Sequence, residues 1–232
     1  MWERQVDGRT LNFHLSGINN QNFIMRDEET GSWWQQVSGE CIAGPLKGKQ
    51  LRLVAHDELP FALWKREQPA GRVLMPDERV AAQYEPADWE DRYATLRVVT
   101  PANPDDPLKP RDLVIGITVN GAATAYPMSR LEKQAPVTDT LGGTPLVVML
   151  DASKKAVRAF ERTVDGRALS FSIKQGTSQI TDAETGSTWE FTGRAVSGAL
   201  AGRRLRPVRV LKDYWFDWKI YHPDTAVFGS DR

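Results

Sequence analysis

Hydrophobic and polar positions alternate over short stretches of the chain, which predicts brief antiparallel strands joined by tight turns. In "FERTVDGRALSF", apolar residues flank Asp165-Gly166. An Asp-Gly pair supplies the positive φ angles that a two-residue hairpin needs. Asp7-Gly8 occupies the same place in "WERQVDGRTLNF", and Asn120-Gly121 divides "VIGITVNGAATAYP". We therefore expect a hairpin at each of these dipeptides, and a slightly longer turn at each Glu-Thr-Gly-Ser stretch.

Helical spacing of apolar residues is confined to a few short stretches. Leu59, Leu63 and the aliphatic stem of Arg66 would share one helix face, with Asp57 as the cap. A later helix would present Tyr214, Trp218 and Tyr221 in the same way. A further helix is expected within "PADWEDRYATL".

The same pattern of motifs occurs twice. "WERQVDGRTLNF" from Trp2 matches "FERTVDGRALSF" from Phe160, and "RDEETGSWW" matches "TDAETGSTW". A ladder of glycine and leucine positions follows in each case, and "FALWKREQP" then matches "WFDWKIYHP". Order and spacing hold with two small slips, which indicates a duplicated unit. The aligned Trp34 and Trp189 are expected in the core, whereas Trp33 and Trp89 are expected at the surface.

These motifs predict an α+β protein, mainly antiparallel β, made of two duplicated units that each end in a short helix. Residues 1–69 form the first unit, 70–110 a charged and then Pro-rich linker, and 111–232 the second. Because Met1 aligns with Ala159, the first unit begins midway through the pattern. We expect the Trp2–Val6 strand to be an open edge that could pair with a second copy, and the natural gene to start further upstream.

Composition removes several classes of function. The 30 basic and 30 acidic residues balance, so charge gives no reason to expect binding to nucleic acid or to an anionic membrane. The apolar runs are too short to span a bilayer, and no signal-peptide pattern is present. Cys41 is the single cysteine and is interpreted as a buried thiol. His14, His56 and His222 lack metal-ligand spacing, so no metal or cofactor is predicted. The compartment is left open.

Several ordered motifs resemble a known family. They are "GSWWQQVSGECIAGPLKGKQL", "VIGITVNGAATAYP", "DTLGGTPLVVML", "FERTVDGRALSF" and "HPDT". Together they are similar to the bacterial domain-of-unknown-function family 3179, across both units. The resemblance implies no established activity, and it implies an exported or membrane-anchored location.

The chain departs from that family at positions where chemistry might be expected. Relatives often carry Cys-x-x-Cys upstream of the Val-Asp-Gly hairpin, but "LDASKKAVRAF" has no cysteine. The segment "INNQNF" after Gly17 also lacks the histidine that the resemblance implies. No metal or redox role is therefore carried over to this chain.

Positions that differ between the two units are the candidates for function. The segment between Phe13 and Asp27, which contains "SGINNQN", is three residues longer than the matching segment between Phe171 and Asp182. Trp33-Trp34-Gln35-Gln36 aligns with Thr188-Trp189-Glu190-Phe191. The candidate ligand-binding residues are Asn19, Asn20, Asn22, Trp33, Gln36 and Glu40. An indole and several amides suit a neutral polar ligand such as a sugar or a peptide. The alternative is an elaborated turn whose Asn side chains hold its own backbone.

The leading interpretation is a non-catalytic extracytoplasmic binding or accessory module, with a small polar ligand or a protein as partner. One alternative is a hydrolase that uses Asp27, Glu29 and Glu40 as acid–base groups. Asp182 and Glu184 recur in the matching turn, which favours turn capping instead. A purely structural interaction domain is the remaining alternative.

Overall fold

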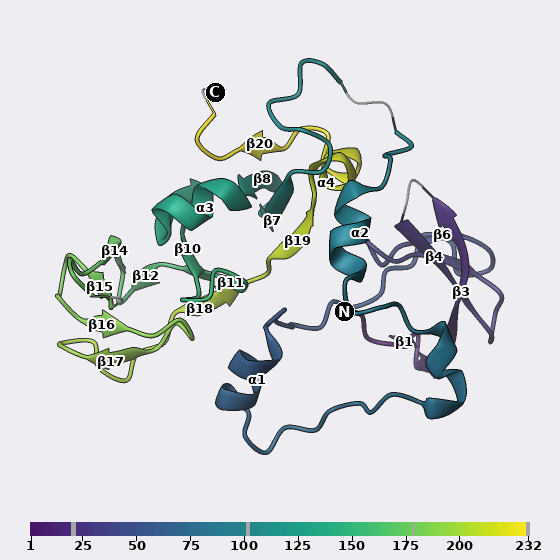
Figure 1. Cartoon of the computed structure of the whole chain (residues 1–232), viewed down its shortest axis with the longest axis horizontal. Helices are drawn as coiled ribbons and strands as arrows, with labels where there is room; N and C mark the ends of the chain where they lie inside the picture. Colours follow the sequence, from purple (N-terminus) through teal and green to yellow (C-terminus); the bar gives the residue numbers. More distant parts are fainter. Residues whose placement is uncertain (20–21, 101–102, 178, 231–232) are drawn as a thin grey trace. The chain divides into compact units, whose positions relative to one another are not determined.

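Antiparallel strands form most of the regular structure, and short helices accompany them (Figure 1). This computed structural model describes residues 1–19, 22–100, 103–177 and 179–230. Packing divides these residues into two units. The first consists of Met1–His56 with a short segment that starts at Val99, and the second of Asp57–Val98 and the residues from 103 onward. The α+β class, mainly antiparallel β, is confirmed.

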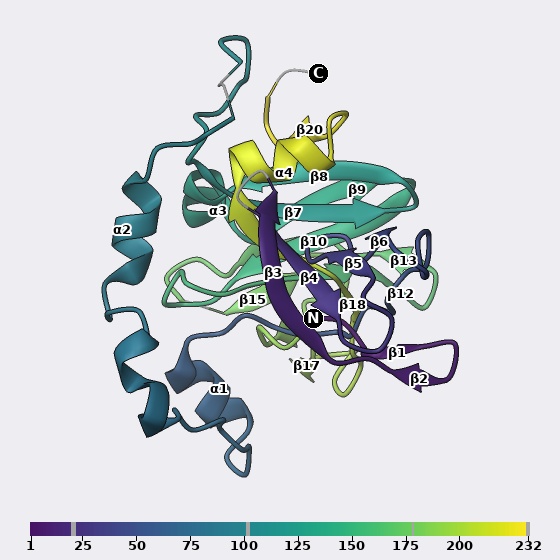
Figure 2. The same cartoon turned by 90° about the vertical axis from the view of Figure 1, so that its right-hand side faces the viewer.

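The first unit contains a small hairpin and a four-stranded sheet, here called the first sheet. The hairpin strands are β1 (Gln5–Val6) and β2 (Arg9–Thr10). The sheet runs in the order β3 (Phe13–Asn19), β4 (Asn22–Asp27), β5 (Trp33–Gln35) and β6 (Cys41–Ala43). Figure 2 shows β3 and β4 side by side as a long curved pair. Asp7 and Gly8 have φ angles of 49° and 76°, which confirms the predicted hairpin turn.

One face of the first sheet forms the core of its unit. Val6, Leu11, Trp34, Cys41 and Leu51 are buried together there. Burial raises the pKa of the Cys41 thiol, because the apolar surroundings disfavour the thiolate. The predicted buried thiol is therefore confirmed.

The second unit contains a sheet with the same strand order, here called the second sheet. Its strands are β14 (Phe171–Ile173), β15 (Ile180–Asp182), β16 (Thr188–Trp189) and β17 (Ala195–Ser197). The hairpin of β12 (Thr163–Val164) and β13 (Arg167–Ala168) precedes it and turns at Asp165-Gly166, as predicted.

The aligned tryptophans hold matching positions in the two sheets. Trp34 pairs with Met25 and Cys41, and Trp189 pairs with Ile180 and Ala195. Both indoles are core residues, with exposed fractions of 0% and 3%. Their predicted burial is confirmed.

Two further sheets complete the second unit. One has the order β18 (Arg206–Val208), β11 (Val157–Glu161), β10 (Thr144–Leu150) and β9 (Val137–Leu141). The other has the order β19 (Leu211–Tyr214), β7 (Leu113–Val119), β8 (Ala122–Pro127) and β20 (Ala226–Val227). Strands β7 and β8 form the hairpin predicted at Asn120-Gly121, and β20 runs parallel to β8.

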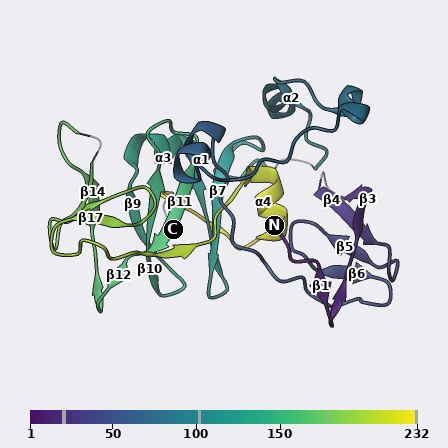
Figure 3. The ribbon, with the colours of Figure 1, turned by 90° about the horizontal axis from the view of Figure 1, so that it is seen from below.

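Strand β10 lies between two cores of the second unit, and Figure 3 shows it between the second sheet and β7. Val147 and Met149 pack against the second sheet, whereas Leu146 and Val148 pack with β7 and β8. Alternate residues of a strand point to opposite faces, so burial of both faces requires a continuous apolar run. This explains "TPLVVML".

The predicted short helices are present. They are α1 (Phe61–Glu67), α2 (Trp89–Thr95) and α4 (Trp215–Tyr221). A fourth helix that the sequence analysis did not predict, α3 (Met128–Gln134), follows β8. Helix α4 packs on β7 so closely that a Cβ atom on Gly116 would lie 2.1 Å from the Trp218 ring. Of the face predicted for α4, Trp218 is buried, and Trp215 and Asp217 supply the other buried side chains.

The predicted capping of α1 by Asp57 is wrong. The helix begins after Pro60 without a side-chain cap. The Asp57 carboxylate instead accepts a hydrogen bond at 2.6 Å from the guanidinium of Arg158 on β11, which also pairs with Glu67 at 2.8 Å. Arg158 is mostly buried, and a buried charge needs such partners because it has lost its hydration.

These ion pairs explain why α1 packs with the second unit. A surface pair between Lys212 and Glu58, at 3.3 Å, adds to them. The compact first unit therefore stops at His56. Repeat boundaries at 69 and 111 stay a prediction about the sequence pattern.

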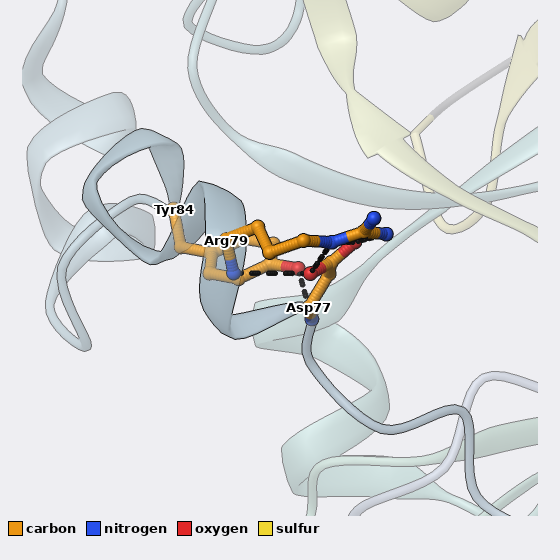
Figure 4. A network of polar contacts seen from close by, with 3 residues as sticks. All are labelled: Asp77, Arg79 and Tyr84. Carbon is orange, nitrogen blue, oxygen red and sulfur yellow. Dashed lines mark hydrogen bonds and ion pairs between the residues drawn. The ribbon is translucent and has the colours of Figure 1, made fainter.

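Residues 70–100 and 103–110 carry local order. The 3-10 helix η1 (Glu78–Gln83) precedes α2. Figure 4 shows that the Asp77 carboxylate accepts hydrogen bonds from the backbone and guanidinium of Arg79, while the Asp77 backbone N–H donates to the Tyr84 hydroxyl at 2.7 Å. These contacts join residues close in sequence and are exposed, so they order the segment and add little stability. Trp89 is exposed, as predicted.

Candidate functional site

Asp27 holds the turn between β4 and β5. Its buried carboxylate accepts hydrogen bonds from the backbone N–H of Thr30 at 2.6 Å and of Ser32 at 3.1 Å. It also accepts from the Trp34 indole N–H at 2.8 Å. Burial alone would raise the pKa of Asp27, but the donors on Trp34 and Thr30 outweigh it and lower the pKa. A carboxylate engaged in this way is poorly suited to act as a general base.

Asp182 makes the same contacts in the second sheet. Its carboxylate accepts from the backbone N–H of Thr185 at 2.6 Å and from the Trp189 indole N–H at 2.9 Å. Its pKa is also lowered, because the donors on Trp189 and Thr185 outweigh the effect of burial. The carboxylates at these positions therefore cap turns in both sheets.

Glu29 also has a structural role. Its carboxylate accepts from the backbone N–H of Asn12 at 2.8 Å and from its side-chain amide at 2.7 Å. The bond from the Asn12 backbone lowers the pKa of Glu29. Glu184 accepts in the same way from the backbone of Ser170, at 2.7 Å. Two of the three carboxylates proposed for hydrolysis thus hold the backbone of their turn.

The two sheets differ in the row of side chains on the face opposite the buried tryptophan. Residues paired across neighbouring strands point to the same face of a sheet. In the first sheet this row, here called the outer row, consists of His14, Arg26, Trp33 and Ala43. The corresponding row of the second sheet consists of Ser172, Thr181, Thr188 and Ser197. At these positions the first sheet therefore carries an arginine, two ring side chains and an alanine. The second sheet carries four serine or threonine side chains at the matching positions.

The outer row is accessible and partly ordered. His14 and Arg26 are exposed, and Trp33 is half-buried. The Arg26 guanidinium lies 5.7 Å from the centroid of the Trp33 ring, and its Nε donates to the carbonyl of Gly31 at 3.2 Å. A cation over an indole is attracted to the ring face and fixes the orientation of both groups. The row therefore offers a ring and a held guanidinium.

The structure brings some of the predicted ligand residues together. Asn19 pairs with Asn22 where β3 and β4 meet, and Asn22 lies on the face of the outer row because it is four residues from Arg26. Asn19, Asn22 and Trp33 therefore share one face of the first sheet, where Asn19 is exposed and Asn22 is buried. Asn20 lies outside the described residues.

Gln36 and Glu40 are placed differently from the other predicted ligand residues. Gln36 lies in the turn after β5, where its backbone N–H donates to the Phe23 carbonyl at 3.1 Å. Glu40 is exposed and pairs with Gln50 in an isolated bridge. Neither belongs to the outer row.

His14 and Arg26 were not among the predicted ligand residues, although the sequence carried a signal for them. Arg26 pairs with Trp33 and His14 pairs with Arg26 on the other side, and both stand where the second sheet has a hydroxyl residue. Comparing only the outward-facing positions of the two repeats would have found them, because the inward-facing ones are fixed by the shared core.

A pair of carboxyl groups in the second unit was also missed. Asp213 and Asp217 stand where the repeat alignment places Leu59 and Leu63. Burial, followed by the charge of Asp217, raises the pKa of Asp213 to about 8. The surroundings of Asp213 thus favour its protonated carboxyl, whose Oδ1 accepts from the backbone N–H of Tyr214 at 2.7 Å. The alignment itself held the signal, since two apolar positions of the first repeat are acidic in the second.

The part of the chain that the structure describes contains neither a metal-ligand cluster nor a membrane-spanning helix. No group of three or more His, Cys, Asp or Glu side chains is arranged there to hold a metal ion. No helix in the described ranges is both long and apolar enough to span a bilayer.

The comparison with known families gives one result. No curated protein and no solved structure matches the chain. A family model described as "Protein of unknown function (DUF3179)" matches residues 1–225, which is nearly the whole chain. The resemblance inferred from the sequence motifs is thereby confirmed, and the chain belongs to the DUF3179 family, whose function is not known.

Proposed function

We propose that the chain is a non-catalytic binding module and that its ligand site is the outer row of the first sheet with Asn19 and Asn22. The observation that carries this proposal is the exchange of a Ser-Thr-Thr-Ser row for a His-Arg-Trp-Ala row on matched strands. A shared scaffold explains what the two sheets have in common, so residues found in only one sheet need a different explanation.

The proposal includes the duplication of one ancestral unit. The matched strand order, the capping of each turn by an aspartate and the burial of each tryptophan support it. Two close approaches support it further. A Cβ atom on Gly44 would lie 2.7 Å from the Cα of Ser32, and one on Gly198 would lie 2.6 Å from the Cα of Ser187. Both sheets thus need glycine at the same place, for the same reason.

The chemistry of the outer row suits a polar ligand with a flat or cyclic part, such as a sugar or a peptide. Trp33 would stack on the ligand, and the exposed amide of Asn19 would form hydrogen bonds with it. Arg26 adds donors suited to a carbonyl or carboxylate group on the ligand. Gln36 lies in the turn after β5, and Glu40 lies just after that turn. Both would contact only a ligand that extends beyond the outer row.

A matched pair of variants tests this proposal. Chitotetraose, cellotetraose and tetra-alanine serve as probes, with isothermal titration calorimetry as the measurement. We expect at least one probe to bind, and Trp33→Ala to weaken its binding about fivefold to tenfold, since an aromatic contact is worth about 1 to 1.5 kcal/mol. Thr188→Ala changes the same position of the second sheet and should leave affinity unchanged. Equal affinities for the two variants would contradict the proposed site.

Replacing the segment "SGINNQN" by the shorter "KQGT" of the second unit separates a ligand site from a self-stabilising turn. A ligand site requires that binding be lost while the first unit stays folded, as judged by slow amide exchange of the Trp34 indole. Binding that survives the replacement would exclude Asn19 and Asn22 from the site.

An interaction domain is a second candidate, favoured by one observation. Ile18 and Phe23 are paired on β3 and β4, and their exposed fractions are 65% and 47%. Exposed apolar side chains that lie together are typical of protein–protein contacts. If they form one between copies of the chain, sedimentation velocity will show an oligomer that Phe23→Lys dissociates. A monomer at all concentrations would remove self-association from consideration.

A further inference from the structure

A cavity of about 510 Å³ lies within the second unit. Three segments line it: the start of β8 at residues 121–124, the end of β9 and its turn at 140–142, and the stretch from the end of α4 to β20 at 221–226. Strand β20 pairs with β8, so the third segment borders the first (Figures 1 and 2). The volume is in the range of small-molecule sites.

Small residues keep this cavity open. Gly121, Ala122 and Ala123 form the wall contributed by β8, where larger side chains would fill the space. Gly142 has a φ angle of 54°, and a Cβ atom there would lie 2.3 Å from the carbonyl oxygen of Val119. Glycine is therefore required at 142, where the two turns of the cavity approach each other.

Thr124 places an unusual hydroxyl group in the wall. Its side chain is only 1% exposed, and its Oγ1 has no hydrogen-bond partner among the described residues. A buried hydroxyl without a partner costs free energy, because it has lost its bonds to water. The surrounding wall contributes further hydroxyls from Thr140 and Thr225. The Oγ1 itself has less than 1 Å² of accessible surface, so a ligand hydroxyl bonds it only after a small movement of the wall, and that bond would recover the cost.

The wall at residues 222–225 is held in place by its own contacts. The ring of His222 lies 3.8 Å from that of Trp218, measured between centroids. The Trp218 indole N–H donates to the Thr225 hydroxyl at 2.9 Å, and the Thr225 backbone N–H donates to the His222 carbonyl at 3.0 Å. The cavity is therefore bordered by a preformed wall, which lowers the entropic cost of binding.

The charges in the lining narrow the class of ligand. Asp224 is the charged residue of the lining, which includes no lysine or arginine, so the lining itself offers an anionic ligand no cation to pair with. Burial, and then the charge of Arg209, lower the pKa of His222, so its ring is neutral at pH 7. Neutral imidazole and hydroxyl groups both donate and accept hydrogen bonds, as do the hydroxyl groups of a polyol.

We propose that this cavity binds an uncharged, hydroxyl-rich molecule of about monosaccharide size, with the Thr124 hydroxyl bonded to a ligand hydroxyl and Asp224 and His222 facing the others. The site is independent of the outer row, which belongs to the other unit. It would add a small-molecule site to the binding module.

Thr124→Val tests the site by two effects of opposite sign. Valine keeps the shape of threonine and removes the hydroxyl. Because that hydroxyl has no partner in the free protein, the variant should unfold at a higher temperature than the parent. The variant should also bind the ligand about fivefold more weakly, since it lacks one hydrogen bond.

The probes are myo-inositol, glucose and N-acetylglucosamine, with lactate and putrescine as charged controls, and saturation-transfer NMR gives the affinities. Thr188→Val, in the second sheet, is the matched control and should bind like the parent. The proposal requires an uncharged probe to bind and Thr124→Val to show both effects. It is overturned if no uncharged probe binds, if a charged control binds more tightly, or if Thr124→Val binds as well as the parent.

Discussion

The first and second sheets share a framework and differ in what they present on one face. Each sheet buries a tryptophan whose indole N–H donates to a turn-capping aspartate, at 2.8 Å in one and 2.9 Å in the other. Facing away from that core, one sheet carries His14, Arg26 and Trp33, and the other carries hydroxyl residues. The inward positions are constrained by packing, whereas the outward ones are free to differ. Function is therefore most reasonably sought where the sheets disagree.

The largest expected effect is on the shared core. Trp34→Ala and Trp189→Ala should each lower the free energy of unfolding by roughly 3–5 kcal/mol, because each leaves a large cavity in a packed core. Urea unfolding followed by circular dichroism measures both. A loss below about 1 kcal/mol for either variant would mean that the two tryptophans do not play matching roles.

The turn-capping aspartates should show the next largest effect. Asp27→Asn and Asp182→Asn weaken the bonds to buried donors, so each should cost about 2 kcal/mol at pH 7. The pKa of both carboxyls is lower in the folded than in the unfolded protein. Their contribution to the free energy of unfolding is therefore fully present above the unfolded pKa of about 3.9, and it is lost as the pH falls through the folded-state pKa. Urea titrations from pH 7 downward should therefore show the difference from the parent shrinking below about pH 4. A difference that is constant with pH would contradict this account of the turns.

A smaller effect, of opposite sign, is expected at Asp213. Its folded-state pKa of about 8 exceeds the unfolded value of about 3.9, so the folded protein holds an extra proton between these values. Asp213 therefore destabilises the fold least below the unfolded pKa. The free energy of unfolding then falls as the pH rises towards 8. Asp213→Asn mimics the protonated carboxyl and should stabilise the protein at pH 8 by at least about 1 kcal/mol, with the gain vanishing near pH 4. A loss of stability at pH 8 would show that the carboxylate form is the one that the fold favours.

Local patterns in the sequence predicted much of the framework. The Asp-Gly and Asn-Gly hairpins, the capped turns and the two buried tryptophans follow from residues close in sequence, whose turn chemistry and alternation act locally. The contact between Arg158 and Glu67 joins residues 91 positions apart, and no local pattern encodes it. For this reason the packing of α1 with the second unit was not predicted.

The candidate site was predicted only in part, for a related reason. Repeat comparison identified Trp33 and the Asn residues because they are extra or different in one unit. It missed Arg26, whose place beside Trp33 depends on the pairing of β4 with β5, and His14, which pairs with Arg26 in a β3–β4 register that shifts at a bulge between Leu15 and Gly17. The cavity beside Thr124 depends on the parallel pairing of β20 with β8, which brings together residues about a hundred positions apart.

The most direct test exchanges the outer row itself. The variant His14→Ser, Arg26→Thr, Trp33→Thr gives the first sheet the row of the second at every position except Ala43 and leaves both cores untouched. The account predicts that the variant loses much less free energy of unfolding than Trp34→Ala, because the row lies outside the core, while calorimetric binding of the oligosaccharide or peptide probe is abolished. Unchanged probe binding, or a loss of stability as large as that of Trp34→Ala, would contradict the claim that the shared positions form the framework and the outer row forms the site.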